Sequence, residues 1–136
     1  MQLNVVDYSE VYFQLMRETA IPSRRGGKFI VVRNGTQRYA VFSPRGLSTY
    51  HANIVERFLQ SQGIQGRYNP KGDEFHFNSP DWEIEGGGHW EIDETKPVLR
   101  ISGASLAYGG FNGPALAAEL RLARAFDGIE IVFAPG

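Results

Sequence analysis

Short runs of alternating or β-rich residues occur along most of the chain and predict a protein that contains many strands. These runs cover residues 28–33, 37–42, 64–68, 74–77, 82–85, 89–93, 98–102 and 129–133. Asn34-Gly35 separates the first two, and this dipeptide is the strongest short signal for a hairpin because both residues tolerate positive φ. We therefore expect a hairpin in which Arg33 pairs with Thr36 and Lys28 with Val41.

A helical spacing replaces the alternation over residues 49–62. His51, Val55, Phe58 and Gln62 recur at the i, i+4, i+7 and i+11 positions, so His51 is expected in the first turn, on the face that packs on the sheet. Ser48 or Thr49 is expected to cap this helix, and Gly63 to end it.

A second helix is expected to begin at Gly113-Pro114, because proline suits the first helical position, and to continue as far as Gly128. Its expected buried stripe consists of Leu116, Leu120, Ala123 and Phe126.

The first 27 residues allow two interpretations. Val5 and Val6 are compatible with a strand, whereas Asp7 or Ser9 could cap a helix over residues 11–16, and the periodicity does not decide between them. We prefer the helix. Residues 22–27 are expected to form a loop in which Arg24 and Arg25 are solvated.

The composition indicates one domain. A chain of 136 residues with 42% hydrophobic content is long enough for one core and too short for two ordinary domains. Strands and helices together predict an α+β fold, with a mixed sheet of about six strands and two main helices packed on it.

The charge and the missing residue types limit the function classes. A net charge of −1 gives no overall field for binding nucleic acid or an anionic membrane. The chain has no cysteine, which excludes disulfides, thiolate chemistry and a zinc site built from cysteines. With neither a secretion signal nor a long apolar span, we expect a soluble, monomeric, cytoplasmic protein.

His51 is the first candidate for chemistry. Near a helix N-terminus the dipole favours the neutral imidazole, which can accept a proton or attack phosphorus. The alternative is a core histidine that is hydrogen-bonded to a carbonyl. Lys28 and Arg45 are expected to lie near His51, because the second strand of the hairpin leads directly into its helix, and this convergence favours a functional role.

The second candidate is the segment from Ser105 to Gly110, which joins a strand to a helix. Backbone N–H groups at such a junction can bind an anion, although the segment is also compatible with an ordinary connection. The triple glycine at residues 86–88 indicates a bulge or a wide turn where another backbone or a ligand approaches closely. Together these features predict a phosphate site.

The other carboxylates and histidines do not favour a glycosidase or a metal site. The carboxylates at residues 83, 85, 91 and 93 alternate with apolar residues and are expected to face solvent, so a glycosidase-like pair receives little weight. His51, His76 and His89 lack the close spacing of metal ligands, and no metal site is expected. His76 is expected to point outward from a strand.

Several strings together resemble one family. Arg45-Gly46, Tyr50-His51-Ala52-Asn53-Ile54, Gly86-Gly87-Gly88 and Ile101-Ser102-Gly103-Ala104-Ser105-Leu106-Ala107-Tyr108-Gly109 occur in the order seen in the Janus/Ocnus family, whose characterised members are phosphohistidine phosphatases. The resemblance covers residues 28–134, with residues 1–27 as an N-terminal extension and residues 64–81 without a clear counterpart. It implies a three-layer α/β/α fold.

The resemblance also implies roles for individual residues. His51 matches the catalytic histidine, Lys28 a phosphate-binding lysine and Arg45 a basic residue near the site, while Tyr50 precedes the catalytic position. The implied phosphate loop consists of Ser105, Leu106 and Ala107.

This chain departs from the family pattern at two places. His89 stands where the family usually has an arginine, which changes the expected orientation or binding of the substrate, and residues 111–114 replace a segment that carries a further histidine.

The implied activity is hydrolysis of the P–N bond of phosphohistidine in proteins, without a metal or another cofactor. His51 acts in it either as general base or as nucleophile. Two alternatives remain. The first is a non-catalytic module that binds a phosphorylated or anionic partner, and the second is a hydrolase of small phosphoramidates.

Overall fold

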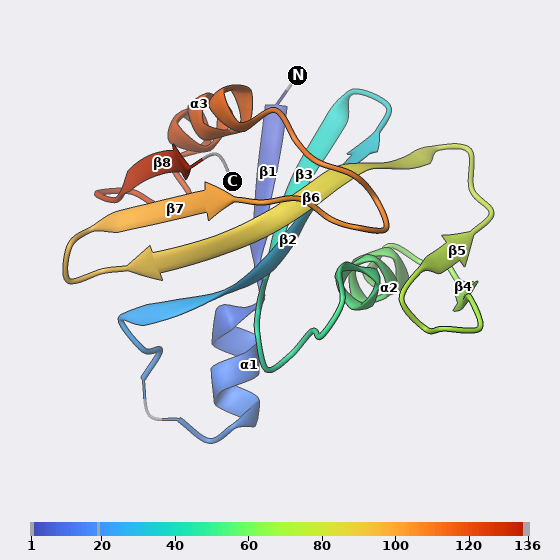
Figure 1. Cartoon of the computed structure of the whole chain (residues 1–136), viewed down its shortest axis with the longest axis horizontal. Coiled ribbons are helices and arrows are strands. Elements are labelled where there is room, and N and C mark those ends of the chain that lie inside the picture. The colour runs from blue at the N-terminus through green and yellow to red at the C-terminus, as the bar shows by residue number, and fades with distance from the viewer. Residues whose placement is uncertain (1, 19, 135–136) are drawn as a thin grey trace.

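A six-stranded mixed sheet forms the centre of the computed structural model, which describes residues 2–18 and 20–134 (Figure 1). Its strand order is β1-β3-β2-β6-β7-β8. The edge strands β1 and β8 run parallel to their neighbours, and the inner pairs are antiparallel. The expected mixed sheet is therefore confirmed. Its strands are β1 (Gln2–Asp7), β2 (Arg24–Asn34), β3 (Gln37–Pro44), β6 (Trp82–Asp93), β7 (Val98–Ser102) and β8 (Glu130–Ala134).

The two long helices, α2 (His51–Ser61) and α3 (Gly113–Ala123), cover opposite faces of this sheet. On β2, Ile30 and Val32 pack with α2, whereas Phe29 and Val31 pack with α3, because successive side chains of a strand point to opposite faces. A separate two-stranded sheet of β4 (Gly66–Tyr68) and β5 (Phe75–Phe77) lies beside α2, and α1 (Ser9–Leu15) follows β1 (Figure 1).

The helix α3 ends earlier than the pattern predicts. Its last residue is Ala123, whereas the pattern predicts a helix as far as Gly128. Arg124 adopts a left-handed conformation with φ 58°, which ends the helix there. Leu116 and Leu120 are buried as expected. Phe126 packs on the core from the turn after the helix, with its ring centroid 5.4 Å from that of Phe42.

The hairpin of β2 and β3 forms, but its predicted register is wrong by two residues. Asn34 pairs with Gln37 and Lys28 with Ser43, so the turn residues are Gly35 and Thr36. Gly35 has φ +60° and Thr36 is not among the residues with positive φ, which is the pattern of a type II′ turn. Because the shift is even, Lys28 keeps the predicted face.

The N-terminal region forms both of the elements that the sequence left open, since β1 precedes α1. The loop expected at residues 22–27 is wrong, because β2 already begins at Arg24. A Cβ at Gly27 would lie 2.0 Å from the Ser43 carbonyl oxygen, so glycine there permits close strand pairing rather than a turn. Arg25 is not solvated, because its side chain is 10% exposed and forms an ion pair with Glu94.

The triple glycine lies inside one continuous strand, β6, and not between two strands. Val31 pairs with Gly86 and Val32 with Ile84, so Glu85 is the extra residue of a β-bulge. The expected bulge is thus confirmed. In the part of the chain that the structure describes, no helix has the length and apolar character needed to cross a membrane.

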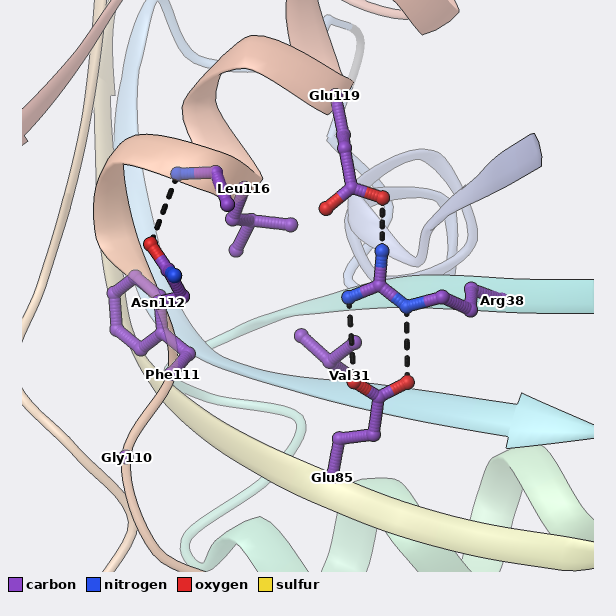
Figure 2. Close-up of a pocket in the computed structure, with 9 residues that line it drawn as sticks. Val31, Arg38, Glu85, Gly110, Phe111, Asn112, Leu116 and Glu119 are labelled. Atoms are coloured by element: carbon purple, nitrogen blue, oxygen red, sulfur yellow. Dashed lines mark hydrogen bonds and ion pairs between the residues drawn. The ribbon is translucent and has the colours of Figure 1, made fainter. Parts of the chain in front are cut away.

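A half-buried ion network ties this bulge to β3 and α3 (Figure 2). Arg38 donates two hydrogen bonds to Glu85, from Nε at 2.9 Å and from Nη2 at 3.3 Å, and its Nη1 donates to Glu119. The three side chains are between 17% and 29% exposed and border a cavity of about 480 Å³. One guanidinium therefore balances two carboxylates.

Replacing Arg38 by methionine should lower the free energy of unfolding by roughly 1–3 kcal/mol, because Glu85 and Glu119 would lose the donors that compensate their partial burial. Urea denaturation followed by circular dichroism measures this loss. The control is Arg33→Met, which breaks the exposed pair with Glu83 and should change stability by less than about 0.5 kcal/mol. Equal losses in the two variants would contradict the structural role of the network.

Candidate active site

A cavity of about 340 Å³ opens between the start of α2, the strands β2 and β6, and the segment that follows β7. It brings together every site residue that the sequence predicts except Arg45. Its lining consists of Lys28, Tyr50, His51, Asp73, Glu74, His89, Ala104, Ser105, Leu106 and Ala107.

The start of α2 places His51 at this cavity. Tyr50 has an extended backbone, and its N–H donates to Asn53 Oδ1 at 2.8 Å, so the helix begins at His51. The prediction of Ser48 or Thr49 as the cap is wrong, because the buried Ser48 hydroxyl forms a hydrogen bond with the Ser43 hydroxyl at 2.7 Å instead. His51 therefore occupies the first helical position.

The His51 ring is 7% exposed and has one defined partner. Its Nε2 lies 2.8 Å from the Gly88 carbonyl oxygen, which can only accept, so Nε2 carries a proton. In the neutral ring the lone pair is then on Nδ1. Among the described residues Nδ1 forms no hydrogen bond, and it is not one of the fully buried unpaired atoms, so it keeps contact with solvent at the cavity that His51 lines.

The surroundings of His51 favour the neutral imidazole. Burial lowers the pKa of His51, and the hydrogen bond to Gly88 opposes this effect only in part. The charges of His89 and Lys28 lower this pKa further. A neutral ring with a free Nδ1 can act as a base or as a nucleophile at pH 7.

Glycine makes room for this ring on the sheet. A Cβ at Gly87 would lie 3.1 Å from His51 Cδ2 and 2.4 Å from the Phe29 carbonyl oxygen. The pairing of β6 with β7 begins at His89, opposite Ser102, so Gly88 lies just before that pairing. The close backbone approach predicted for the triple glycine is confirmed at Gly86, where a Cβ would lie 2.0 Å from the Gly110 carbonyl oxygen, and the His51 side chain uses the room at Gly87 in addition.

Lys28 and His89 are direct neighbours across β2 and β6. The His89 ring stands edge-on to that of His51, with 5.7 Å between the ring centroids. Burial lowers the pKa of His89, and the charges of Lys28 and Arg45 add to this effect. The ammonium of Lys28 and a ring that is neutral at pH 7 therefore border the cavity beside His51.

Arg45 lies outside the cavity lining. Its backbone N–H donates to the Gly26 carbonyl oxygen at 3.0 Å, and its Nη1 lies 3.2 Å from the position that a Cβ of Gly26 would take. The guanidinium is thus placed over Gly26, two residues along β2 from Lys28. It affects the cavity through its charge.

The segment after β7 is folded into a tight loop. Ser105 and Gly109 exchange two backbone hydrogen bonds of 3.0 and 2.9 Å, and the Tyr108 N–H donates to Ser105 Oγ at 3.1 Å. The Ser105 amide is therefore not available to a ligand. Within the described chain the N–H groups of Leu106 and Ala107 have no partner, and these two amides remain for an anion.

Two acidic residues at the cavity were not predicted. Asp73 and Glu74 belong to the turn between β4 and β5, which has the residues of an ordinary hairpin turn. The Tyr108 hydroxyl brings this turn to the cavity, because it accepts from the Phe75 N–H at 2.9 Å and donates to the Phe75 carbonyl oxygen at 3.2 Å. No local pattern in the sequence indicates this contact.

Comparison of the chain with protein-family models and with curated proteins gave no match. In residues 2–18 and 20–134, no three histidine, aspartate or glutamate side chains are grouped as ligands for a metal ion. The groups at the cavity that suit an anion are the imidazole of His51, the ammonium of Lys28 and the two free amides. Such a set can bind a small anion and act on it as a base or nucleophile.

Acid should destabilise the protein through His51. The folded state keeps this imidazole neutral, whereas the unfolded chain binds a proton near the ordinary pKa of about 6.5. Because the unfolded state binds more protons in this range, the free energy of unfolding should fall as the pH drops below about 6.5. Urea denaturation at pH 7.5 and pH 5.0 measures this fall.

In His51→Asn the same change of pH should cost less stability, while His76→Asn should behave like the original protein, because His76 is exposed on β5. His89 adds to the fall in all three proteins. An identical pH dependence in His51→Asn and the original protein would show that burial does not keep His51 neutral.

Proposed function

We propose that this protein is a metal-independent phosphohistidine phosphatase of the Janus/Ocnus type, which hydrolyses the P–N bond with His51. The observation that carries the proposal is the shared cavity, in which His51, Lys28 and the loop at residues 105–107 meet although they are far apart in the chain. Three strings of the resemblance contribute directly to this site: the one with His51, the triple glycine and the loop.

The reaction needs a nucleophile, compensation of charge and a protonated leaving group. The ammonium of Lys28 and the amides of Leu106 and Ala107 hold the phosphoryl oxygens. Binding through these groups orients the phosphorus toward His51 Nδ1. The exposed Tyr50 and His89 border the same space and limit the orientation of the substrate.

His51 can complete the reaction in two ways. As a base, Nδ1 takes a proton from water, the water oxygen bonds to phosphorus, and the P–N bond breaks as the leaving imidazole receives that proton from Nδ1. As a nucleophile, Nδ1 bonds to phosphorus while the P–N bond of the substrate breaks and the leaving imidazole takes a proton from solvent; water then cleaves the new P–N bond, which gives phosphate and neutral His51. In both routes Nε2 keeps its hydrogen bond to Gly88.

A non-catalytic phosphate-binding module is the main alternative, and a hydrolase of small phosphoramidates is the second. The accessible Nδ1 of a buried histidine favours catalysis, because binding alone needs only the donors of Lys28 and the loop. Incubation with a phosphohistidine peptide and with phosphoramidate separates the three functions. A phosphatase releases phosphate from the peptide, a small-molecule hydrolase prefers phosphoramidate, and a binding module releases none.

Replacing His51 by glutamine should reduce phosphate release from a phosphohistidine peptide by at least about a hundredfold, because the side-chain amide has no basic nitrogen. The released phosphate is measured under single-turnover and steady-state conditions, with circular dichroism to verify the fold. His76→Gln, on β5 outside the cavity, is the control and should keep full activity. Undiminished turnover in a folded His51→Gln would refute the assigned role.

Replacing Lys28 by methionine should raise KM by about tenfold or more, since a charge-assisted contact with the phosphoryl oxygens is lost while the length of the side chain is kept. Initial rates over a range of peptide concentrations give KM and kcat. Lys96→Met, in the turn between β6 and β7, removes the same charge away from the cavity. If both variants had the same KM, Lys28 would not bind the substrate.

A further inference from the structure

Two acidic residues, Asp73 and Glu74, form one side of the proposed site, and we call them the acidic wall. A site that binds only phosphate does not need them. The carboxylates of Asp73 and Glu74 line the cavity together with Lys28. Both belong to the segment 64–81, for which the family resemblance offers no counterpart. The wall is therefore a feature of this chain, and its chemistry has to be explained from its own contacts.

Side-chain hydrogen bonds hold this wall in place. Asn69 Oδ1 accepts from the N–H groups of Asp73 and Glu74, each at 3.1 Å, and Asn69 Nδ2 donates to Asp73 Oδ1 at 2.8 Å. The next residue, Phe75, is buried and bound on both its N–H and its carbonyl by the Tyr108 hydroxyl. Tyr108 itself follows the amides of Leu106 and Ala107. The turn backbone and the Asp73 carboxylate are thus fixed relative to the anion-binding loop, whereas the Glu74 carboxylate, 41% exposed and 3.8 Å from His76 Nε2, is carried by the fixed backbone.

The charges that line the cavity do not suit an isolated phosphate. Among the lining residues Lys28 contributes one positive charge and the two carboxylates contribute two negative charges, so their formal sum is −1 while His51 and His89 are neutral. Arg45, outside the lining, adds one positive charge on the side of Lys28 and His89, so the positive and negative charges lie on different sides of the cavity. A doubly charged phosphoryl group is attracted by Lys28 and repelled by the wall. A substrate with a positive group beside the phosphoryl group removes this conflict, since each of its ends meets the opposite charge.

We propose that Asp73 and Glu74 select phosphoramidate substrates that carry a cationic group, an ammonium or a guanidinium, next to the phosphoryl group. This inference rests on the proposed function for the phosphoryl end of the substrate. The cation lies against the wall while Lys28 and the loop hold the phosphoryl oxygens. Asp73 and Glu74 are specificity residues and take no part in the bond cleavage.

Binding of a non-hydrolysable analogue tests the proposal without requiring turnover. Calorimetry compares two peptides that contain a phosphonate analogue of phosphohistidine, one with arginine and one with the uncharged isostere citrulline as the next residue. The arginine peptide should bind about fivefold more tightly, the upper range for a solvent-exposed ion pair. The double variant Asp73→Asn/Glu74→Gln should remove this preference, because both substitutions keep the shape of the wall and the Asp73 acceptor for Asn69.

The control variant Asp81→Asn/Glu91→Gln changes the net charge equally but alters exposed residues outside the cavity, and it should keep the preference. The free analogue with and without its α-ammonium shows whether a small molecule can supply the cation. The proposal would be overturned if the arginine and citrulline peptides had equal Kd values and if the free analogue bound equally well with and without its α-ammonium. A preference that survives in Asp73→Asn/Glu74→Gln, or one that disappears in the control, would also overturn it.

Phosphate release from the hydrolysable arginine peptide is measured in parallel. A preference in binding without any turnover would leave the cation selection standing and reject the phosphatase. Turnover without a preference for the arginine peptide would support the phosphatase and reject the cation selection.

Discussion

The hydrogen bond from His51 Nε2 to the Gly88 carbonyl oxygen is the contact on which the site depends. It determines which ring nitrogen carries the proton and leaves Nδ1 accessible at the cavity. It also requires three independent features of the fold: a helix that begins at His51, a strand whose glycines let the ring lie against it, and a pairing of β6 with β7 that begins only after Gly88. A side chain at Gly87 would crowd the His51 ring and clash with the Phe29 carbonyl oxygen of β2.

The candidate site and the ion network of Arg38 lie on opposite faces of the sheet. Lys28 lies on the face of β2 that packs against α2, so the ammonium and the histidine are on the same side. On the other face Arg38 ties the Glu85 bulge to α3. The residue after this bulge is the first of the three glycines. The ion network (Figure 2) therefore holds the strand segment that receives His51. None of its side chains is among the residues that line the His51 cavity.

The small sheet of β4 and β5 contributes two acidic residues to the cavity. It lies beside α2 (Figure 1). Its turn, with Asp73 and Glu74, lines the cavity that His51 and the loop also border. One hydroxyl group, that of Tyr108, joins it to that loop. The cavity is thereby bordered by donors for an anion on one side and by acceptors for a cation on the other, which is an arrangement suited to a substrate of mixed charge.

Local patterns in the sequence determined the α+β class, the hairpin, the helix that carries His51 and the convergence of Lys28 with it, and the family resemblance added Tyr50, His89 and the loop at residues 105–107. These features depend on neighbours within a few residues, where periodicity and turn chemistry act. Tertiary structure alone decided the two-residue shift of the hairpin, the start of β2 at Arg24 and the tautomer of His51. It also decided that the Ser105 N–H is already bonded to Gly109, and that Asp73 and Glu74 lie at the cavity. These depend on contacts between residues that are far apart, such as the 37 residues from His51 to Gly88 and the 33 from Phe75 to Tyr108, and local periodicity contains no information about such contacts.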